Sequence, residues 1–257
     1  MMKEIIFFDI DGTILNHDKQ IPSKTKQAIK DLREQGHFVA IATGRAPFMF
    51  EELRQELEID SYVSFNGQFV VFENKLLYHN PLNKEELHRL HQYSNNLDHP
   101  LVFMNQESMK SSVPHHRYIE ESMKTLQFSH PEHDDLFYQD KHIFQSLLFV
   151  EEREEYLYEG RFPDFQFVRW HPFSVDVIPK GGSKAEGIKR MVDILGMNMK
   201  DVYAFGDGLN DIEMLQTVGT GVVMGNASDE VKQHGNFITK PVDEDGIWFG
   251  LKELGLI

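Results

Sequence analysis

Apolar runs separated by polar turns mark the expected strands in the first 80 residues. Residues 3–10 and 37–45 are mostly apolar, as expected for strands buried inside a sheet. Residues 61–80 contain two or three shorter runs, with a turn expected at Asn66-Gly67. Charged residues stand at the ends of these runs, so the runs differ from segments that are apolar throughout.

Amphipathic stretches with helical spacing lie between these runs. Residues 21–36 have a 3.6-residue apolar period, with Ser23 as the expected N-cap and Gly36 as the stop. Residues 47–59 form a second expected helix, because Pro47 stands at a favoured first-turn position. Strands that alternate with helices favour a doubly wound, mainly parallel sheet.

The pattern changes over residues 81–178. Short apolar runs of strand type are mixed with two helical stretches, and the segment is rich in histidine and aromatic residues. No strict alternation of strand and helix is present here, so this segment predicts an inserted α+β domain.

Strand and helix alternate again after residue 178, ending in a helical stretch near the C-terminus. We therefore predict an α/β fold: a doubly wound, mainly parallel, Rossmann-like core sheet with an inserted α+β domain. The core would comprise residues 1–80 and 179–257, and the insertion residues 81–178.

Composition narrows the classes of partner and compartment. The formal net charge is −15, which disfavours nucleic acid and anionic membrane surfaces. Cysteine is absent, which excludes disulfides and thiolate chemistry. The N-terminal apolar stretch is interrupted by acidic residues, and no run approaches the roughly 20 apolar residues of a membrane helix. We expect a cytoplasmic protein, and no obligate protein partner is inferred.

Unusual polar residues follow several of the apolar runs. They are Asp9 and Asp11, Thr43-Gly44-Arg45, Asp207 to Asp211, and Gly225-Asn226. In an open α/β sheet, ligands bind outside the carboxyl ends of the strands. These four stretches are therefore expected on one rim of the core sheet.

The aspartates of this rim predict a hard divalent cation. An EF-hand calcium loop starting at Asp9 is excluded, because Ile14 stands where glycine is required and Gln20 where glutamate is required. Magnesium takes about six oxygen ligands and often pairs a few carboxylates with a phosphate. Asp9, Asp11, Asp207 and Asp211 are the candidate metal ligands.

Four motifs in order resemble those of the haloacid dehalogenase superfamily phosphatases. They are Asp9-Ile10-Asp11-Gly12-Thr13, Thr43-Gly44-Arg45, Lys184, and Gly206-Asp207-Gly208 with Asn210-Asp211. The stretches "SFNG", "PKGGSK", "VVMGNA" and "DEDGI" resemble the Cof-type branch, whose class IIB cap is inserted between the second and third motifs. One departure is Gln68, where the family often has alanine.

This resemblance implies a role for each motif residue. Asp9 would attack phosphorus and bind Mg²⁺, and Asp11 would act as acid and base while giving a backbone carbonyl to the metal. Asp207 would ligate the metal, and Asp211 would hold a metal-bound water. The phosphate would be bound by Ile10, Thr43, Gly44, Lys184 and Asn210.

Further residues are weaker candidates for substrate or supporting contacts. Arg45 could touch phosphate or pair with an aspartate, and pairing is favoured. Asn66-Gly67 could be a standard hairpin turn or a substrate contact, and neither is favoured. The remaining candidates are Asn226, Trp170 and His171.

The predicted function is a Mg²⁺-dependent phosphatase for small phosphorylated metabolites, acting through an aspartyl-phosphate intermediate, with a cap that closes over the site. A phosphotransferase or phosphomutase on the same fold is the first alternative. A non-catalytic sugar-phosphate sensor is the second, although it would not need both Asp9 and Asp11.

Overall fold

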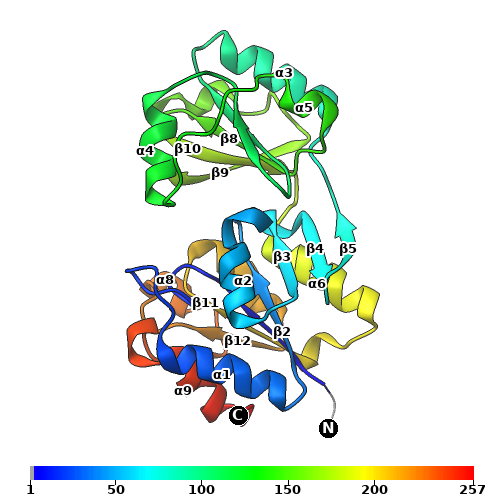
Figure 1. Ribbon diagram of the computed structural model, residues 1–257, viewed down its shortest axis with the longest axis vertical. Coiled ribbons are helices and arrows are strands. Elements are labelled where there is room, and N and C mark those ends of the chain that lie inside the picture. The colour runs from blue at the N-terminus through cyan, green and yellow to red at the C-terminus, as the bar shows by residue number, and fades with distance from the viewer. Residues whose placement is uncertain (1–2) are drawn as a thin grey trace. The chain divides into compact units, whose positions relative to one another are not determined.

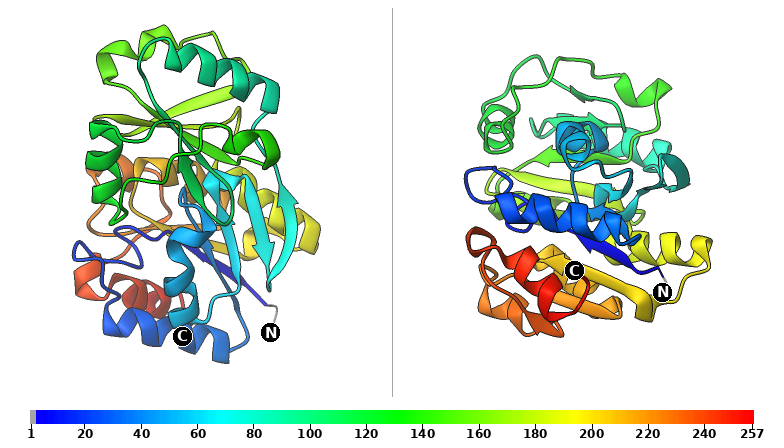
Figure 2. Two further views of the ribbon diagram at one scale, coloured as in Figure 1. Left: turned by 45° about the horizontal axis from the view of Figure 1, so that its top comes forward. Right: turned by 60° about the horizontal axis from the view of Figure 1, so that its bottom comes forward.

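The computed structural model describes residues 3–257 and divides the chain into two compact units (Figure 1). The core unit contains the chain up to residue 45, residues 50–79 and residues 183–257; the inserted unit contains residues 46–49 and 80–182. Figure 2 shows that elements from both ends of the chain, blue to cyan and yellow to red, gather in the core unit, whereas the green elements form the inserted unit. Residues 1–2 of the predicted core segment lie outside the described residues.

Within residues 3–257, the core unit holds an eight-stranded sheet in the order β13-β12-β11-β1-β2-β3-β4-β5. All pairs from β13 to β3 are parallel, and β3, β4 and β5 pair antiparallel. The α/β, mainly parallel fold expected from the sequence is therefore confirmed. The strands are β1 (Ile5–Phe8), β2 (Phe38–Ala42), β3 (Ser61–Ser64), β4 (Phe69–Phe72), β5 (Lys75–His79), β11 (Val202–Gly206), β12 (Thr220–Val223) and β13 (Phe237–Ile238).

Helices cover the core sheet because its strands are apolar on both faces. Ile5 and Phe7 of β1 pack in a cluster with residues of α6 (Lys184–Leu195) and α7 (Ile212–Thr217). The alternate side chains of β1 are equally buried, and α1 (Ser23–Glu34) contacts both β2 and α9 (Gly246–Glu253). The shorter helices are α2 (Glu51–Leu57) and α8 (Asp229–Lys232).

The strand order places the sequence motifs at a switch in topology. From β1 the chain extends the sheet through β2 and β3 on one side, and through β11 and β12 on the other. The residues that follow the carboxyl ends of β1 and β11 therefore meet where ligands bind in such sheets. Those residues include Asp9 and Asp207.

Two predicted helix boundaries are wrong. Helix α1 begins at Ser23, and its N-cap is Pro22, which makes no side-chain cap hydrogen bond. The helix expected over residues 47–59 is a 3₁₀ turn at Pro47–Phe50 followed by α2, because Phe50 leaves the helical conformation between them. Short turns of this kind have no apolar period that a sequence pattern could reveal.

The inserted unit is a five-stranded antiparallel sheet in the order β7-β6-β8-β10-β9, with helices beside it. Residues 46–49, 80 and 179–182 belong to this unit as well, beyond the predicted segment 81–178. Residues 46–49 contact this unit through Phe48, whose ring centroid lies 6.3 Å from that of Phe128. The elements are α3 (Lys84–Asn95), β6 (Leu101–Met104), β7 (Met109–Ser111), α4 (Arg117–Thr125), α5 (Phe137–Asp140), β8 (Gln145–Phe149), β9 (Phe165–His171) and β10 (Ser174–Pro179).

Candidate active site

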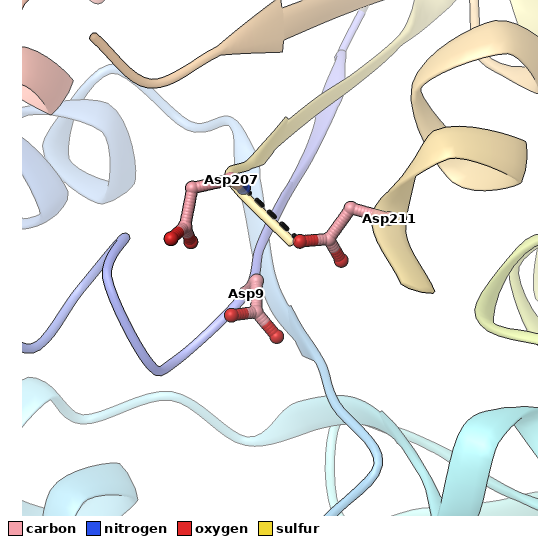
Figure 3. A group of neighbouring side chains, drawn as sticks. All are labelled: Asp9, Asp207 and Asp211. Carbon is pink, nitrogen blue, oxygen red and sulfur yellow. Dashed lines mark hydrogen bonds between the residues drawn. The ribbon is translucent and has the colours of Figure 1, made fainter. Parts of the chain in front are cut away.

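Three carboxylates from two loops converge at the carboxyl edge of the core sheet (Figure 3). Asp9 directly follows β1, Asp207 directly follows β11, and Asp211 ends the 3₁₀ turn Leu209–Asp211. One oxygen from each can be chosen so that all three lie within 4.8 Å of one another. Hard oxygen donors at this spacing suit Mg²⁺, so the residues present fit the predicted metal.

Lys184 neutralises part of this acidic group. It is the first residue of α6, and its side chain is buried with 1% exposure. Its Nζ lies 2.5 Å from Asp9 Oδ1 and 2.6 Å from Asp211 Oδ1. Burial alone would lower the pKa of Lys184, but Asp211 and Asp9 outweigh it and raise that pKa, so the lysine stays charged.

The environment opposes ionisation of Asp9. Burial raises its pKa to about 8, against the attraction of Lys184, and the neighbouring Asp211 and Asp207 add to the rise. Three carboxylates and one lysine leave this group with a formal charge of −2. A bound dication would balance that charge and favour the ionised form of Asp9.

Asp207 is oriented through both of its carboxylate oxygens. The hydroxyl of Thr13 donates to Oδ1 at 2.9 Å, and the amide of Asn226 donates to Oδ2 at 3.2 Å. Asn226 also donates to the Gly12 carbonyl at 2.9 Å. Burial raises the pKa of Asp207 to about 6, with the Thr13 hydrogen bond opposing the rise.

The buried side chain of Asp211 stabilises its own loop by hydrogen bonds to the backbone. Its Oδ2 accepts the backbone N–H groups of Asp207 at 3.0 Å and Gly208 at 2.9 Å, while Oδ1 accepts from Lys184. The side chain has no exposed surface. It therefore fixes the position of Asp207 relative to Lys184, and its predicted contact with a metal-bound water stays a prediction.

Asp11 has different partners from the other aspartates. Arg45 donates to it twice, from Nε at 2.9 Å and Nη2 at 2.7 Å, and Lys19 Nζ donates at 2.6 Å. Of the two contacts considered for Arg45, pairing with an aspartate is the one present. Burial would raise the pKa of Asp11, but Arg45 and Lys19 outweigh it and lower that pKa, which favours the ionised carboxylate.

The candidate phosphate-binding residues surround the same edge. Ile10 follows Asp9 and is buried, Thr43 and Gly44 follow β2, and Asn210 is exposed in the turn before Asp211. The hydroxyl of Thr43 accepts the backbone N–H of Arg45 at 3.1 Å. Their predicted contacts with phosphate stay predictions.

The turn at Asn66-Gly67 joins β3 to β4 and also touches two motifs. Asn66 has φ 51° and Gly67 φ 93°, and the Asn66 N–H donates to the Thr43 carbonyl at 3.2 Å. A Cβ at Gly67 would lie 2.1 Å from the Ser183 carbonyl oxygen, just before Lys184. The segment is therefore the predicted hairpin turn, and it also packs between the Thr43 loop and the residue before Lys184.

Trp170 and His171 lie on β9 of the inserted unit. His171 Nδ1 lies 2.9 Å from the Ser122 hydroxyl and accepts the Phe173 N–H at 3.2 Å. The buried Nε1 of Trp170 has no hydrogen-bond partner among the described residues. Their predicted contact with substrate stays a prediction.

Sequence reasoning did not identify Thr13 and Lys19 as site residues. Thr13 lies inside the first motif, and that position is the signal that could have found it. Lys19 has no comparable signal, because it stands in a polar loop without periodicity and reaches Asp11 only after that loop folds back.

Among residues 3–257, no helix is long and apolar enough to cross a membrane. The predicted cytoplasmic location and the expected absence of protein partners stay predictions.

Comparison with known proteins places the chain in a family. The chain is 52% identical to "Putative phosphatase YkrA" of Bacillus subtilis (strain 168) over 257 residues, covering 100% of both chains. A crystal structure of a hypothetical protein from Geobacillus kaustophilus HTA426 matches with TM-score 0.96 and 56% identity, covering 100% of both chains. The subclass IIB sugar phosphatase BT4131 matches with TM-score 0.86 and 29% identity, covering 99% of this chain and 100% of that one. The family model for haloacid dehalogenase-like hydrolases matches residues 6–251, and the chain belongs to this family.

Proposed function

We propose that this chain is a Mg²⁺-dependent phosphatase that hydrolyses small phosphorylated metabolites through an aspartyl phosphate on Asp9. The observation that carries the proposal is the position of Asp9, which lies beside Lys184 and within 4.8 Å of Asp207 and Asp211. The names "Putative phosphatase YkrA" and "Sugar Phosphatase BT4131" support the same reaction class.

Asp9 and Asp11 divide the reaction between them. An Asp9 oxygen attacks phosphorus, and the bond from phosphorus to the leaving-group oxygen breaks as Asp11 gives that oxygen a proton. Asp11 then removes a proton from water, whose oxygen attacks phosphorus and breaks the bond to Asp9, releasing inorganic phosphate. Each proton transfer of this kind contributes about 10²–10⁴-fold to the rate.

The other residues orient the phosphoryl group and balance its charge. Lys184, the Thr43 hydroxyl, Asn210 and the backbone amides of Ile10 and Gly44 supply donors to its oxygens. Asp9, Asp207, Asp211 and the Asp11 carbonyl would hold Mg²⁺, which supplies further positive charge when bound. The inserted unit, as the cap domain, would select the leaving group and exclude bulk water by closing.

The test is phosphate release from a panel of sugar phosphates and nucleotides in Mg²⁺, with and without EDTA. We expect turnover that EDTA abolishes and that Asp9→Asn reduces to background. Asp18→Asn is the matched control, since that side chain is 80% exposed in the same region, and it should leave turnover unchanged.

Failure of the whole panel with Mg²⁺, or full activity in Asp9→Asn, would overturn the proposal. Formation of a phosphorylated isomer without free phosphate would identify a phosphotransferase or mutase instead. Binding of sugar phosphate with no chemical change would identify a sensor.

A further inference from the structure

Lys19 reaches Asp11 from a loop that Asn16 closes by hydrogen bonds. Asn16 Oδ1 accepts the N–H groups of Asp18 at 3.1 Å and Gln20 at 3.0 Å, which closes the loop on itself. Lys19 has φ 58°, a left-handed conformation that disfavours a side chain by about 1–2 kcal/mol. Asn16 also donates to Asp243 at 2.9 Å, which ties the loop to the chain before α9.

The result is a cluster with a surplus of positive charge. Lys19 and Arg45 both contact Asp11, giving the three side chains a formal charge of +1. The group of Asp9, Asp207, Asp211 and Lys184 has a formal charge of −2, which attracts a cation. The cluster around Asp11 therefore attracts anionic groups, whereas the carboxylate group around Asp9 attracts cations.

Lys19 has hydrogen-bonding capacity left for a ligand. An ammonium group carries three N–H donors, and within residues 3–257 its only acceptor is Asp11 Oδ1. Its side chain is 32% exposed and that of Asp11 is 41% exposed, so both are open to a bound molecule. Arg45 is more enclosed at 15%.

We infer that Lys19 selects substrates whose leaving group carries a second anionic group, a carboxylate or a further phosphate. The inference rests on the proposed function, in which Asp11 gives its proton to the leaving-group oxygen. Because Lys19 contacts Asp11, its ammonium lies beside that oxygen and within reach of the groups next to it. A neutral polyol leaving group would leave the surplus charge without a partner.

The experiment compares two ligands that differ in one group. 3-Phosphoglycerate and glycerol 3-phosphate share a three-carbon skeleton, and only the first has a carboxylate on the leaving group. Their inhibition constants against hydrolysis of p-nitrophenyl phosphate are measured for the wild type, Lys19→Met, Lys19→Arg and Lys24→Met. Lys24 is the control, because it lies on α1, its side chain is 54% exposed and its ion-pair partner is Asp245.

We expect the wild type to prefer the carboxylate ligand, and Lys19→Met to lose about tenfold of that preference, the size of one charge-assisted hydrogen bond. Lys19→Arg and Lys24→Met should keep the preference. Circular dichroism and melting temperature check that each variant is folded; if Lys19→Met is not, Lys19→Gln replaces it.

Three outcomes would overturn the inference. They are the absence of any carboxylate preference in the wild type, an unchanged preference in Lys19→Met, and an equal weakening of both ligands and of inorganic phosphate. The last would assign Lys19 to the phosphoryl group. Absence of wild-type turnover of p-nitrophenyl phosphate and of every member of the sugar-phosphate and nucleotide panel would instead overturn the proposed function, and this inference with it.

Discussion

Gly187 sets how closely α6 approaches the sheet, and replacing it with alanine should displace Lys184. A Cβ at Gly187 would lie 2.4 Å from Val63 Cγ1 and 2.7 Å from the Gly67 Cα. Carbon atoms pack best about 3.5–4.0 Å apart, so the first turn of α6 would have to recede by about 1 Å. Lys184 belongs to that turn and would leave its positions 2.5 Å from Asp9 and 2.6 Å from Asp211.

The two effects of Gly187→Ala have different magnitudes. Overpacking costs about 1–3 kcal/mol, and the better helix propensity of alanine offsets about 1 kcal/mol, so the net loss of stability is about 0–2 kcal/mol. A displacement of about 1 Å in a catalytic group can reduce the rate about 100-fold. We therefore expect a large fall in kcat with a modest fall in melting temperature.

The assay is kcat and KM for p-nitrophenyl phosphate together with thermal unfolding. Ile188→Val is the matched control, because Ile188 is the next residue of α6, is fully buried and packs in the core cluster that contains Val63. It should lose about 0.5–1.5 kcal/mol without pushing the helix away, and so should keep its kcat. If Gly187→Ala lost only as much kcat as Ile188→Val, Gly187 would not position Lys184.

Two further predictions concern single hydrogen bonds, one to Asp207 and one at the start of α4. Asn226→Ala removes a donor to Asp207 and should weaken Mg²⁺ binding about tenfold by calorimetry; unchanged affinity would contradict an orienting role. His116 caps α4 by accepting the Tyr118 N–H, and burial, then His115, His130 and His99, lower its pKa below the ordinary 6.5. As the pH falls, His116 takes up a proton in the unfolded chain before it does so in the folded chain. The stability that neutral His116 contributes is therefore complete above pH about 6.5 and is lost as the pH falls toward the lowered pKa. His116→Asn keeps the cap without titrating, so urea unfolding at pH 7.5 and 5.5 should show a smaller loss than the wild type; an equal loss would refute the role of His116.

Much of the core could be predicted because short stretches of sequence specify its strands. Each apolar run identified a strand, and the carboxyl ends of parallel strands share one edge, so Asp9, Thr43 and Asp207 were expected together. Their positions follow from strand direction and do not require the details of side-chain packing. In the inserted unit, the same reasoning missed α5 and the 3₁₀ turn at Glu152–Leu157, which are too short to show a period.

The sequence by itself determined which groups stand at the ends of the strands: acids after β1 and β11, and Thr43-Gly44-Arg45 after β2. Only the tertiary structure decided what each group contacts. Asp9 faces a buried lysine 175 residues away, whereas Asp11, two positions later, is held by Arg45 and by Lys19 from a folded-back loop. Partners of this kind depend on long-range packing and on burial, which no short-range pattern of apolar and polar residues contains.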